Sequence, residues 1–327
     1  MFSPQYDPTQ HFSPTFVRFA DSLVQGLVDR YAIRNKRVLE IGCGKGEFLQ
    51  RICAAGDNAG LGVDPSYDPN REVEPQAELQ FLQESYTDQH AEFDPDWVCC
   101  RHTFEHIRDT GDFLDHLGRS LGGRTDRLYF FEVPDATRIL TESAFWDVYY
   151  EHCNYFTPET LAWQFQHHGF EVLESSVDYD RQYVVLVARW TGNGKQNAEP
   201  QPADSISEFQ SQVKQFNTNT QSQIQHWQDK LAQFAKQGPT AIWGGASKGV
   251  AFLTTLGVTD EVAYAIDVNP HKRDRFMPGS GHKTIHPDDM TPDTAPTNIV
   301  LMNPVYQTEV QDLLTQKGIR STLTTIV

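Results

Sequence analysis

The segment that most constrains the fold is an apolar strand that runs directly into a turn with three glycines, Val38-Leu39-Glu40-Ile41-Gly42-Cys43-Gly44-Lys45-Gly46. Glycines let the backbone pass close beneath a ligand, and the helix expected after the turn presents free N–H groups there. The spacing E-x-G-x-G-x-G differs from the G-x-G-x-x-G of dinucleotide sites. The acid precedes the glycines, so the end of the strand favours a cationic group over a pyrophosphate.

Two further acids follow at the ends of the next predicted strands. Asp64 stands 24 residues after Glu40, where a carboxylate can accept hydrogen bonds from both ribose hydroxyls. Glu84 closes the following strand, where an adenine amino group would lie. Each acid alone indicates only a solvated strand end, but the ordered set predicts S-adenosylmethionine (SAM) as the cofactor. Its amino-acid part and sulfonium would lie at Glu40, Gly42, Cys43, Gly44 and Gly46.

Strand and helix patterns alternate between residues 37 and 190, which predicts a parallel sheet with helices on both faces. The expected strands are residues 37–41, 61–63, 79–82, 97–100, 128–131 and 183–188. The expected helices between them are residues 46–55, 110–121 and 158–168. Apolar residues at three- and four-residue spacing also predict a helix from Phe16 to Tyr31.

Composition divides the chain into four parts. Residues 1–35 form an N-terminal helical cap, and residues 36–190 form a Rossmann-like cofactor-binding domain. Residues 191–238 hold a Gly-, Pro-, Asn- and Gln-rich linker and a long amphipathic helix. Its apolar stripe packs within the chain or forms a homodimer seam. Residues 239–327 form a smaller α/β, Rossmann-like domain, with expected strands at 240–243, 262–266 and 297–302 and helices from 250 and at 309–317.

The negative net charge argues against partners that are themselves strongly negative. Lys and Arg number 27 against 44 Asp and Glu, a net charge of −17, which argues against nucleic acid and anionic membrane surfaces. The five cysteines form no C-x-x-C pair, so neither a disulfide scaffold nor a metal site is expected. No signal pattern or long apolar stretch is present, so the expected compartment is the cytoplasm.

The glycine turn and the ordered acids resemble those of the class I SAM-dependent methyltransferases. More specific motifs follow, and together they resemble the nucleotide-deoxysugar C-methyltransferases. These motifs are Phe131-Glu132-Val133-Pro134, Tyr149-Tyr150-Glu151-His152 with Tyr155-Phe156, Trp243 to Gly249, Asp267-Val268-Asn269-Pro270-His271-Lys272, and Met277-Pro278-Gly279. The paired-cysteine zinc domain with which many of those enzymes begin has no counterpart in this sequence, which leaves the sugar unspecified.

The resemblance implies methylation of a sugar carbon beside a ketone, through an enolate. In that family pattern His152 is the base, Glu151 orients it, and Tyr149 donates a hydrogen bond to an oxygen of the sugar or enolate. His106 matches a second family histidine on the turn after the fourth strand. His102 is the alternative to His106, and with Arg101 it is assigned to the cofactor site.

The C-terminal domain is expected to bind the nucleotide of the substrate. Lys248 lies in its glycine turn, and a basic cluster follows that includes Lys272 and Arg273. A diphosphate would be drawn to such groups, although a solvated loop without a ligand is the alternative. Tyr306 would add contacts at a late strand end, and Tyr6 matches a tyrosine that reaches the active site in the family.

Two other functions fit the same sequence. The chain could methylate oxygen or nitrogen of a carbohydrate or small metabolite, with Glu151 and His152 activating the acceptor. It could also be a non-catalytic binding protein that keeps a SAM fold, although the intact Glu40, Gly42, Gly44 and Asp64 argue against a lost cofactor site.

Overall fold

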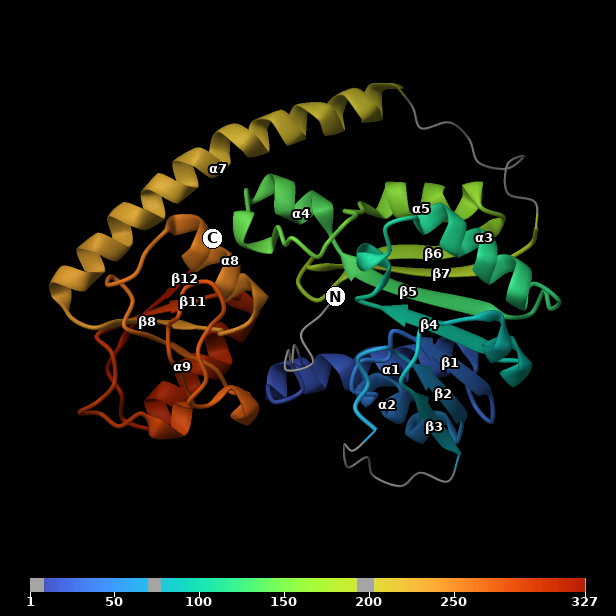
Figure 1. The fold of residues 1–327 in the computed structure, drawn as a ribbon, viewed down its shortest axis with the longest axis horizontal. Helices are drawn as coiled ribbons and strands as arrows, with labels where there is room; N and C mark the ends of the chain where they lie inside the picture. The colour runs from blue at the N-terminus through green and yellow to red at the C-terminus, as the bar shows by residue number, and fades with distance from the viewer. Residues whose placement is uncertain (1–8, 70–77, 193–202, 327) are drawn as a thin grey trace. The chain divides into compact units, whose positions relative to one another are not determined.

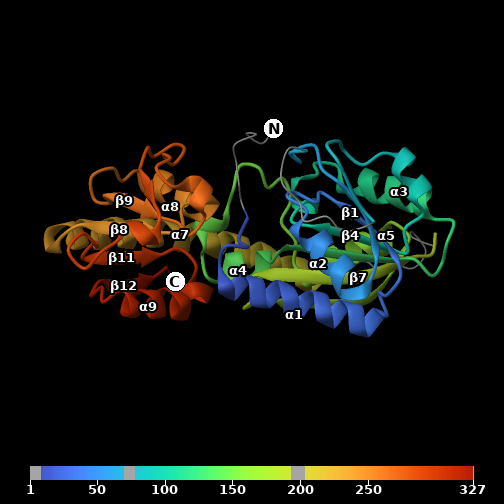
Figure 2. The ribbon, with the colours of Figure 1, turned by 90° about the horizontal axis from the view of Figure 1, so that it is seen from below.

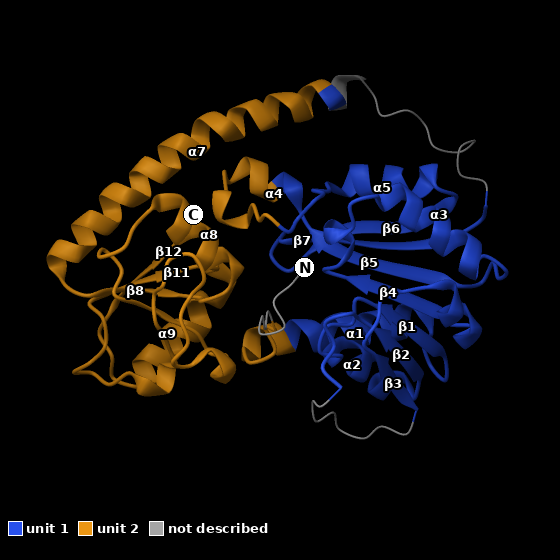
Figure 3. Cartoon of the chain, in the orientation of Figure 1, with its two compact units in different colours: residues 1–5, 18–137, 151–206 blue, residues 6–17, 138–150, 207–327 orange. Residues whose placement is uncertain are grey.

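The computed structural model describes residues 9–69, 78–192 and 203–326 (Figure 1). The chain forms two compact units (Figure 3). Among the described residues, unit 1 comprises 18–69, 78–137, 151–192 and 203–206, and unit 2 comprises 9–17, 138–150 and 207–326. Each unit is built on its own sheet, as the sequence predicts.

Unit 1 holds a seven-stranded sheet of order β3-β2-β1-β4-β5-β7-β6. Its strands are β1 (Arg37–Ile41), β2 (Ala59–Val63), β3 (Leu79–Leu82), β4 (Trp97–Arg101), β5 (Leu128–Pro134), β6 (Phe170–Asp178) and β7 (Tyr183–Trp190). The first five are parallel, and all five were predicted from the sequence.

The sheet is not wholly parallel, which corrects the sequence-based expectation. β7 pairs antiparallel with both β5 and β6, and β6 was not predicted at all. Only residues 179–182 join β6 to β7, and so short a connection permits a hairpin but no parallel crossover. Tyr179, Asp180 and Arg181 all have positive φ in this turn.

Helices cover both faces of this sheet, as predicted (Figure 1). α1 (Pro14–Tyr31) and α2 (Glu47–Gly56) pack with Val38, Cys99 and Phe130 on one face. α3 (Thr110–Leu121) and α5 (Pro158–His167) pack with the alternate residues Leu39, Val98 and Phe131 on the other. Figure 2 shows α1 running along the sheet beside β7, where Phe19 contacts Tyr179 and Tyr183. Short 3-10 helices are η1 (Asp88–Phe93) and η2 (Phe104–His106).

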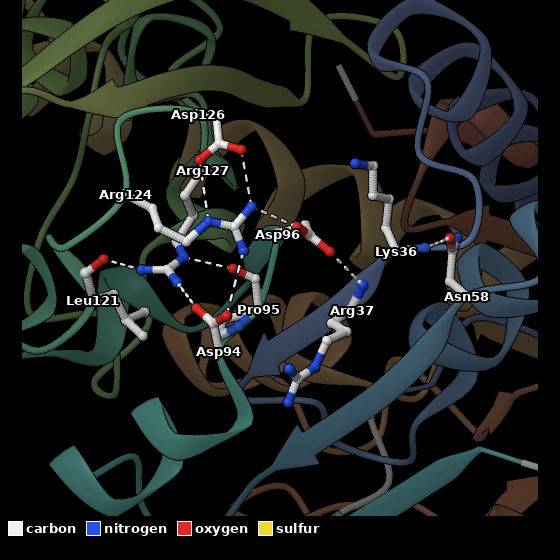
Figure 4. A network of polar contacts seen from close by, with 10 residues as sticks. All are labelled: Lys36, Arg37, Asn58, Asp94, Pro95, Asp96, Leu121, Arg124, Asp126 and Arg127. Carbon is white, nitrogen blue, oxygen red and sulfur yellow. Dashed lines mark hydrogen bonds and ion pairs between the residues drawn. The ribbon is translucent and has the colours of Figure 1, made fainter.

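The N-terminal ends of β1, β4 and β5 are fixed by a network of arginines and aspartates (Figure 4). Arg127 is buried, and it donates to the Pro95 and Leu121 carbonyls and to Asp94. Arg124 pairs with Asp96, which in turn accepts from the Arg37 N–H. This end of a parallel sheet is opposite the end where α/β folds bind ligands, so the network serves stability.

Unit 2 holds a five-stranded, fully parallel sheet of order β10-β9-β8-β11-β12. Its strands are β8 (Thr240–Trp243), β9 (Tyr264–Ile266), β10 (Thr284–Ile285), β11 (Asn298–Leu301) and β12 (Thr322–Thr325). Its helices are α4 (Ala136–Thr141, begun in unit 1), η3 (Phe145–Asp147), α7 (Ala203–Gln237), α8 (Ser247–Leu256), η4 (Pro270–Lys272), η5 (Pro287–Asp289), η6 (Pro304–Tyr306) and α9 (Gln307–Gln316). The short β10 and the terminal β12 were not predicted.

The apolar stripe of α7 packs in part within its own chain. Trp227, Leu231 and Phe234 are buried in a cluster with Phe252 of α8. Ile206 and Val213, nearer the start of the helix, are exposed. Packing within the chain therefore accounts for the C-terminal part of the stripe, and the homodimer seam stays a prediction for its N-terminal part.

Two segments group differently from the sequence-based division. Residues 9–17 lie in unit 2, where Ser13 Oγ donates to Glu309 (2.7 Å) and Tyr306 OH to Gln10 (2.6 Å). Residues 138–150 also lie there, with the Phe145 ring stacked on Phe252 at 6.0 Å. Long-range side-chain packing determines this grouping, and the local composition of these segments does not indicate it.

No helix within residues 9–69, 78–192 and 203–326 has the length and apolar character that crossing a membrane requires.

Candidate active site

The glycine turn after β1 has the backbone that the sequence predicts. Gly42, Gly44 and Gly46 all have positive φ, at 72°, 53° and 79°. A Cβ on Gly42 would lie 2.0 Å from Thr103 Oγ1, and one on Gly46 would lie 2.5 Å from the Phe81 ring. Glycine is therefore required at both positions by backbone conformation and by space. The thiol of Cys43, between them, is buried, and burial raises its pKa well above the usual range, so it stays neutral.

Glu40 is a buried carboxylate on β1, only 2% exposed. Burial raises its pKa to about 8, although the nearby Arg101 guanidinium opposes the shift. Its Oε2 atom has no hydrogen-bond partner within the described part of the chain. A buried carboxylate oxygen without a donor is costly, and a cationic ligand bearing N–H groups would relieve that cost. The site therefore fits the ammonium and sulfonium of SAM.

Asp64 connects the end of β2 to the glycine turn. Its Oδ2 accepts from the Gly44 N–H at 2.8 Å, and its Oδ1 accepts from Ser66 N and Oγ at 2.6 and 2.7 Å. The residue is half-buried, so its carboxylate is placed to receive ribose hydroxyls. Glu84 lies beyond β3, is mostly exposed, and contacts His90 Nε2 at 2.9 Å. Its predicted contact with adenine stays a prediction.

Arg101 and His102, predicted to bind the cofactor, both contact Glu132 of β5. The distances from Arg101 Nη2 and His102 Nε2 to Glu132 Oε1 are 2.7 Å each. Burial alone would raise the pKa of Glu132, but the Arg101 guanidinium and the contact with His102 lower it to about 2. Arg101 also lies 4.2 Å above the ring of Phe48 in α2. These contacts hold both side chains inside unit 1, and their predicted binding of the cofactor stays a prediction.

Backbone hydrogen bonds bring the segment that carries His152 to the loop after β4. The Glu105 carbonyl accepts from Cys153 N (2.9 Å) and Asn154 N (3.1 Å), and Asn154 Nδ2 donates to the Ile107 carbonyl at 2.6 Å. His106 Nδ1 donates to the Glu151 carbonyl at 3.0 Å. The rings of His106 and His152 consequently lie edge to face, with centroids 4.8 Å apart.

Glu105, which was not among the site residues predicted from the sequence, lies beside His106 and His152. It is 2% exposed, its Oε1 lies 3.9 Å from His102 Nδ1, and burial raises the pKa of its carboxyl group. Ligand atoms of Glu105, His106 and His152 all lie within 4.8 Å of one another, so the three could hold a metal ion. No metal site was expected from the sequence, because His152 is far from the other two along the chain. The one available signal was an acid directly beside a candidate histidine.

Glu151 and Tyr149 make different contacts from those predicted. The Glu151 side chain is exposed, and its carbonyl, rather than its carboxylate, contacts a histidine, His106. The Tyr149 hydroxyl donates to Asp147 Oδ1 at 2.9 Å within unit 2. Their predicted roles toward His152 and the substrate stay predictions.

The residues predicted to bind substrate in unit 2 each have a partner in the chain. Lys248 Nζ contacts Asp147 Oδ1 at 2.6 Å, Lys272 Nζ contacts Asp267 at 3.0 Å, and Arg273 pairs with Asp289. Tyr306 binds Gln10, and Tyr6 lies outside the described residues. The basic cluster of the sequence is thus largely neutralised by neighbouring acids, because the fold places an aspartate beside each of these cations.

Comparison with family models identifies the chain. Residues 16–175 match a methyltransferase domain, and residues 195–322 match a C-methyltransferase C-terminal domain. The chain belongs to the class I SAM-dependent methyltransferases. It is therefore an enzyme with SAM as its cofactor, and the alternative of a non-catalytic binding protein is set aside.

Solved structures resemble the methyltransferase only distantly. One is the 1,6-didemethyltoxoflavin-N1-methyltransferase of Burkholderia thailandensis with bound S-adenosylhomocysteine (19% identity, 53% of this chain and 78% of that chain, TM-score 0.39). Another is the magnesium protoporphyrin IX methyltransferase of Synechocystis PCC 6803 (15%, 54% and 84%, 0.42). A third is a SAM-dependent methyltransferase of Aquifex aeolicus (13%, 58% and 100%, 0.43). No curated protein sequence matches the methyltransferase significantly.

Proposed function

We propose that this methyltransferase transfers the methyl group of SAM to a ring carbon of a nucleotide-linked keto-deoxysugar, a step of carbohydrate biosynthesis. The observation that carries the proposal is the pair of imidazoles, His106 and His152, at the carboxyl end of β4. β4 is the neighbour of β1, whose glycine turn fits the cofactor. The match of residues 195–322 to a C-methyltransferase C-terminal domain favours carbon as the acceptor.

The proposed mechanism begins with a ketone at sugar C4, which acidifies the proton on C3. His152 accepts that proton, and the electron pair of the C–H bond forms the enolate. The enolate carbon attacks the methyl group of SAM, the C–S bond pair returns to sulfur, and the proton leaves His152 to water.

We assign supporting roles in the proposed reaction to His106 and Tyr149. His106 donates Nδ1–H to the Glu151 carbonyl, which leaves Nε2 as the acceptor nitrogen of the neutral ring, suited to a substrate hydroxyl. Tyr149 would exchange its acceptor Asp147 for the enolate oxygen.

The nucleotide would be recognised in unit 2 by Lys248, Lys272, Arg273 and Tyr306, with Tyr6 as a further contact. Lys272 and Arg273 would then exchange Asp267 and Asp289 for phosphate oxygens. Titration with TDP, GDP, UDP and CDP in the presence of SAM tests this part. Binding of one diphosphate supports it, and binding of none limits unit 2 to a structural role.

The reaction is tested with SAM and nucleotide-linked 4-keto-6-deoxysugars, with NMR locating the new methyl group. A second assay follows exchange of the C3 proton into D₂O with S-adenosylhomocysteine in the cofactor site. His152→Ala should abolish both methyl transfer and exchange while leaving SAM affinity unchanged. His116→Ala, which removes a histidine beside Asp88 on unit 1, is the matched control. A methyl group on oxygen or nitrogen, formed without C3 exchange, would establish the O- or N-methyltransferase alternative.

A homodimer is proposed through the exposed face of α7 that carries Ile206 and Val213. Light scattering on the wild type and on the Ile206→Glu variant tests it. A monomeric wild type would contradict it.

A further inference from the structure

We propose that Glu105, His106 and His152 form a binding site for a divalent transition-metal ion of the zinc class. One carboxylate oxygen and two imidazole nitrogens, all within 4.8 Å of one another, supply the ligands. Two imidazoles and one carboxylate make a ligand set found in catalytic zinc sites, with a further position left open. Zinc lies about 2.0–2.2 Å from such ligands, so the ion would draw the three groups closer together.

The first support is the state of the Glu105 carboxylate. It is almost fully buried, and its Oε2 makes no hydrogen bond to any described residue. Its other oxygen, Oε1, lies 3.9 Å from His102 Nδ1, which is too long for a hydrogen bond. A buried carboxylate oxygen left without a donor is unfavourable, and a divalent ion beside it would remove that penalty.

The second support is the orientation of His106. Histidines that bind metals usually donate their other ring N–H to a carboxylate or a backbone carbonyl, which fixes the tautomer and the ring. His106 Nδ1 donates in this way to the Glu151 carbonyl at 3.0 Å. The remaining nitrogen, Nε2, therefore carries the lone pair that a metal requires.

The third support is that the backbone holds the two ligand segments together before any ion binds. Cys153 N and Asn154 N both donate to the carbonyl of Glu105, so His152 is anchored directly to the residue that supplies the carboxylate. Both histidines are half-buried, which leaves the ion a route from solvent.

The consequence for catalysis rests on the proposed function. A neutral imidazole has one basic lone pair, so a metal on His152 would take the lone pair that accepts the C3 proton, and the metal-bound enzyme would not form the enolate. Zinc-class ions should therefore inhibit methyl transfer, and a chelator should restore it.

The test uses the full chain without a histidine tag, stripped of metal, and titrated with Co²⁺ in the absence of SAM. Ligation by two imidazoles and a carboxylate gives visible d–d absorption, a readout independent of methyl transfer. The wild type should bind one Co²⁺ per chain with such a spectrum. Glu105→Gln should weaken binding by at least about 100-fold, beyond the roughly 10- to 100-fold typical of a lost outer partner.

His168→Gln is the matched control, because His168 also contacts a carboxylate of unit 1, Asp115, at 2.7 Å. It should leave Co²⁺ binding unchanged, and retained SAM affinity in both variants shows that they fold. No Co²⁺ spectrum in the wild type, or equal affinity in Glu105→Gln, would overturn the site. The spectrum decides this even if no keto-sugar is methylated, so failure of the metal site and failure of the proposed function are distinguishable.

Discussion

At the scale of single residues, Glu40 couples cofactor binding to proton release. Its raised pKa, about 8, means that below this pH the empty site holds a protonated carboxyl group. Binding of a cation favours the carboxylate and expels the proton. The Kd for SAM should therefore fall with rising pH, by up to about tenfold per unit, and level off above about pH 8. Calorimetry across pH, in buffers of different ionisation enthalpy, measures both the affinity and the proton released.

Glu40→Gln is the control for this linkage, since it should bind SAM more weakly and with no such pH dependence. A wild-type Kd that is constant over the same range would contradict the linkage. The same pKa also predicts how the stability of the enzyme without SAM responds to pH. Between the ordinary pKa of 4.5 and about 8, the folded state retains a proton that the unfolded state has lost, so the free energy of unfolding falls as pH rises.

The glycines of the cofactor turn offer a prediction with an internal comparison. Gly42→Ala and Gly44→Ala both force alanine into positive φ, which costs about 1–2 kcal/mol. Only at Gly42 would the new Cβ also lie 2.0 Å from Thr103 Oγ1, whereas at Gly44 it meets no described heavy atom within 4 Å. Gly42→Ala should lower Tm and SAM affinity clearly more than Gly44→Ala, as thermal melts and titrations will show. Equal effects would mean that space around the turn is unimportant.

At the scale of residues, the sequence predicts the part of the candidate site that lies in local motifs and misses the part that long-range contacts assemble. The glycines, Glu40 and Asp64 could be predicted as cofactor residues because they form a local motif on consecutive elements; their contacts with the cofactor stay predictions. Glu105 was missed because neither its burial nor its approach to His152 has a local signal. Lys272 and Arg273 were predicted as part of a local basic cluster, and their acidic partners Asp267 and Asp289 become neighbours only in the fold.

At the scale of elements, the network at the amino ends of the strands predicts a purely structural effect. Arg127→Met would leave the Pro95 and Leu121 carbonyls without their donor, at about 1–3 kcal/mol for each buried group. Arg124 is 30% exposed and makes ion pairs, so Arg124→Met should cost less than about 1 kcal/mol. Urea unfolding compares the two free energies of unfolding. SAM affinity should stay unchanged in both variants, and a loss of affinity without a loss of stability would argue against the structural role.

The elements themselves differ in how well the sequence predicts them. β1 to β5 are short apolar runs bounded by turns, and all were found. β6 was missed because most of its side chains are exposed and include two glutamates and two serines, so it lacks the apolar run that marked the other strands. Its partner β7 is buried along most of its length, so the strand itself was predicted. Its antiparallel direction was not predicted, because that direction follows from the short hairpin with β6.

At the scale of the whole molecule, unit 2 combines the C-terminal part of the chain with residues 138–150 from the middle of the sequence, and it is incomplete without them. Asp147 of this segment is buried between Arg138 and Lys248, which together lower the pKa of its carboxyl group despite burial. Lys248→Met removes one of these partners while Arg138 remains, so it should destabilise unit 2 by about 1.5–3 kcal/mol, the contribution of a hydrogen bond to a charged group. Hydrogen exchange should show faster opening in residues 138–150 and 240–256, with SAM affinity preserved. Unchanged exchange there would show that the ion pair contributes little.

Because the chain passes between the two units more than once, the units cannot be separated by cutting the gene at one position. The polypeptide leaves unit 1 after residue 137, returns at 151, and leaves again near 206. Phe145 and Trp146, inside the first excursion, are buried against Phe252. A gene ending at codon 192 would thus encode a cofactor domain that displays these two aromatic rings to water. In the sequence, the Gly- and Pro-rich linker looks like a domain boundary at which genes could recombine. Recombination there would separate the two aromatic residues from Phe252 and yield aggregating products. Domain exchange that keeps the protein folded therefore requires both parts of the chain to be transferred together.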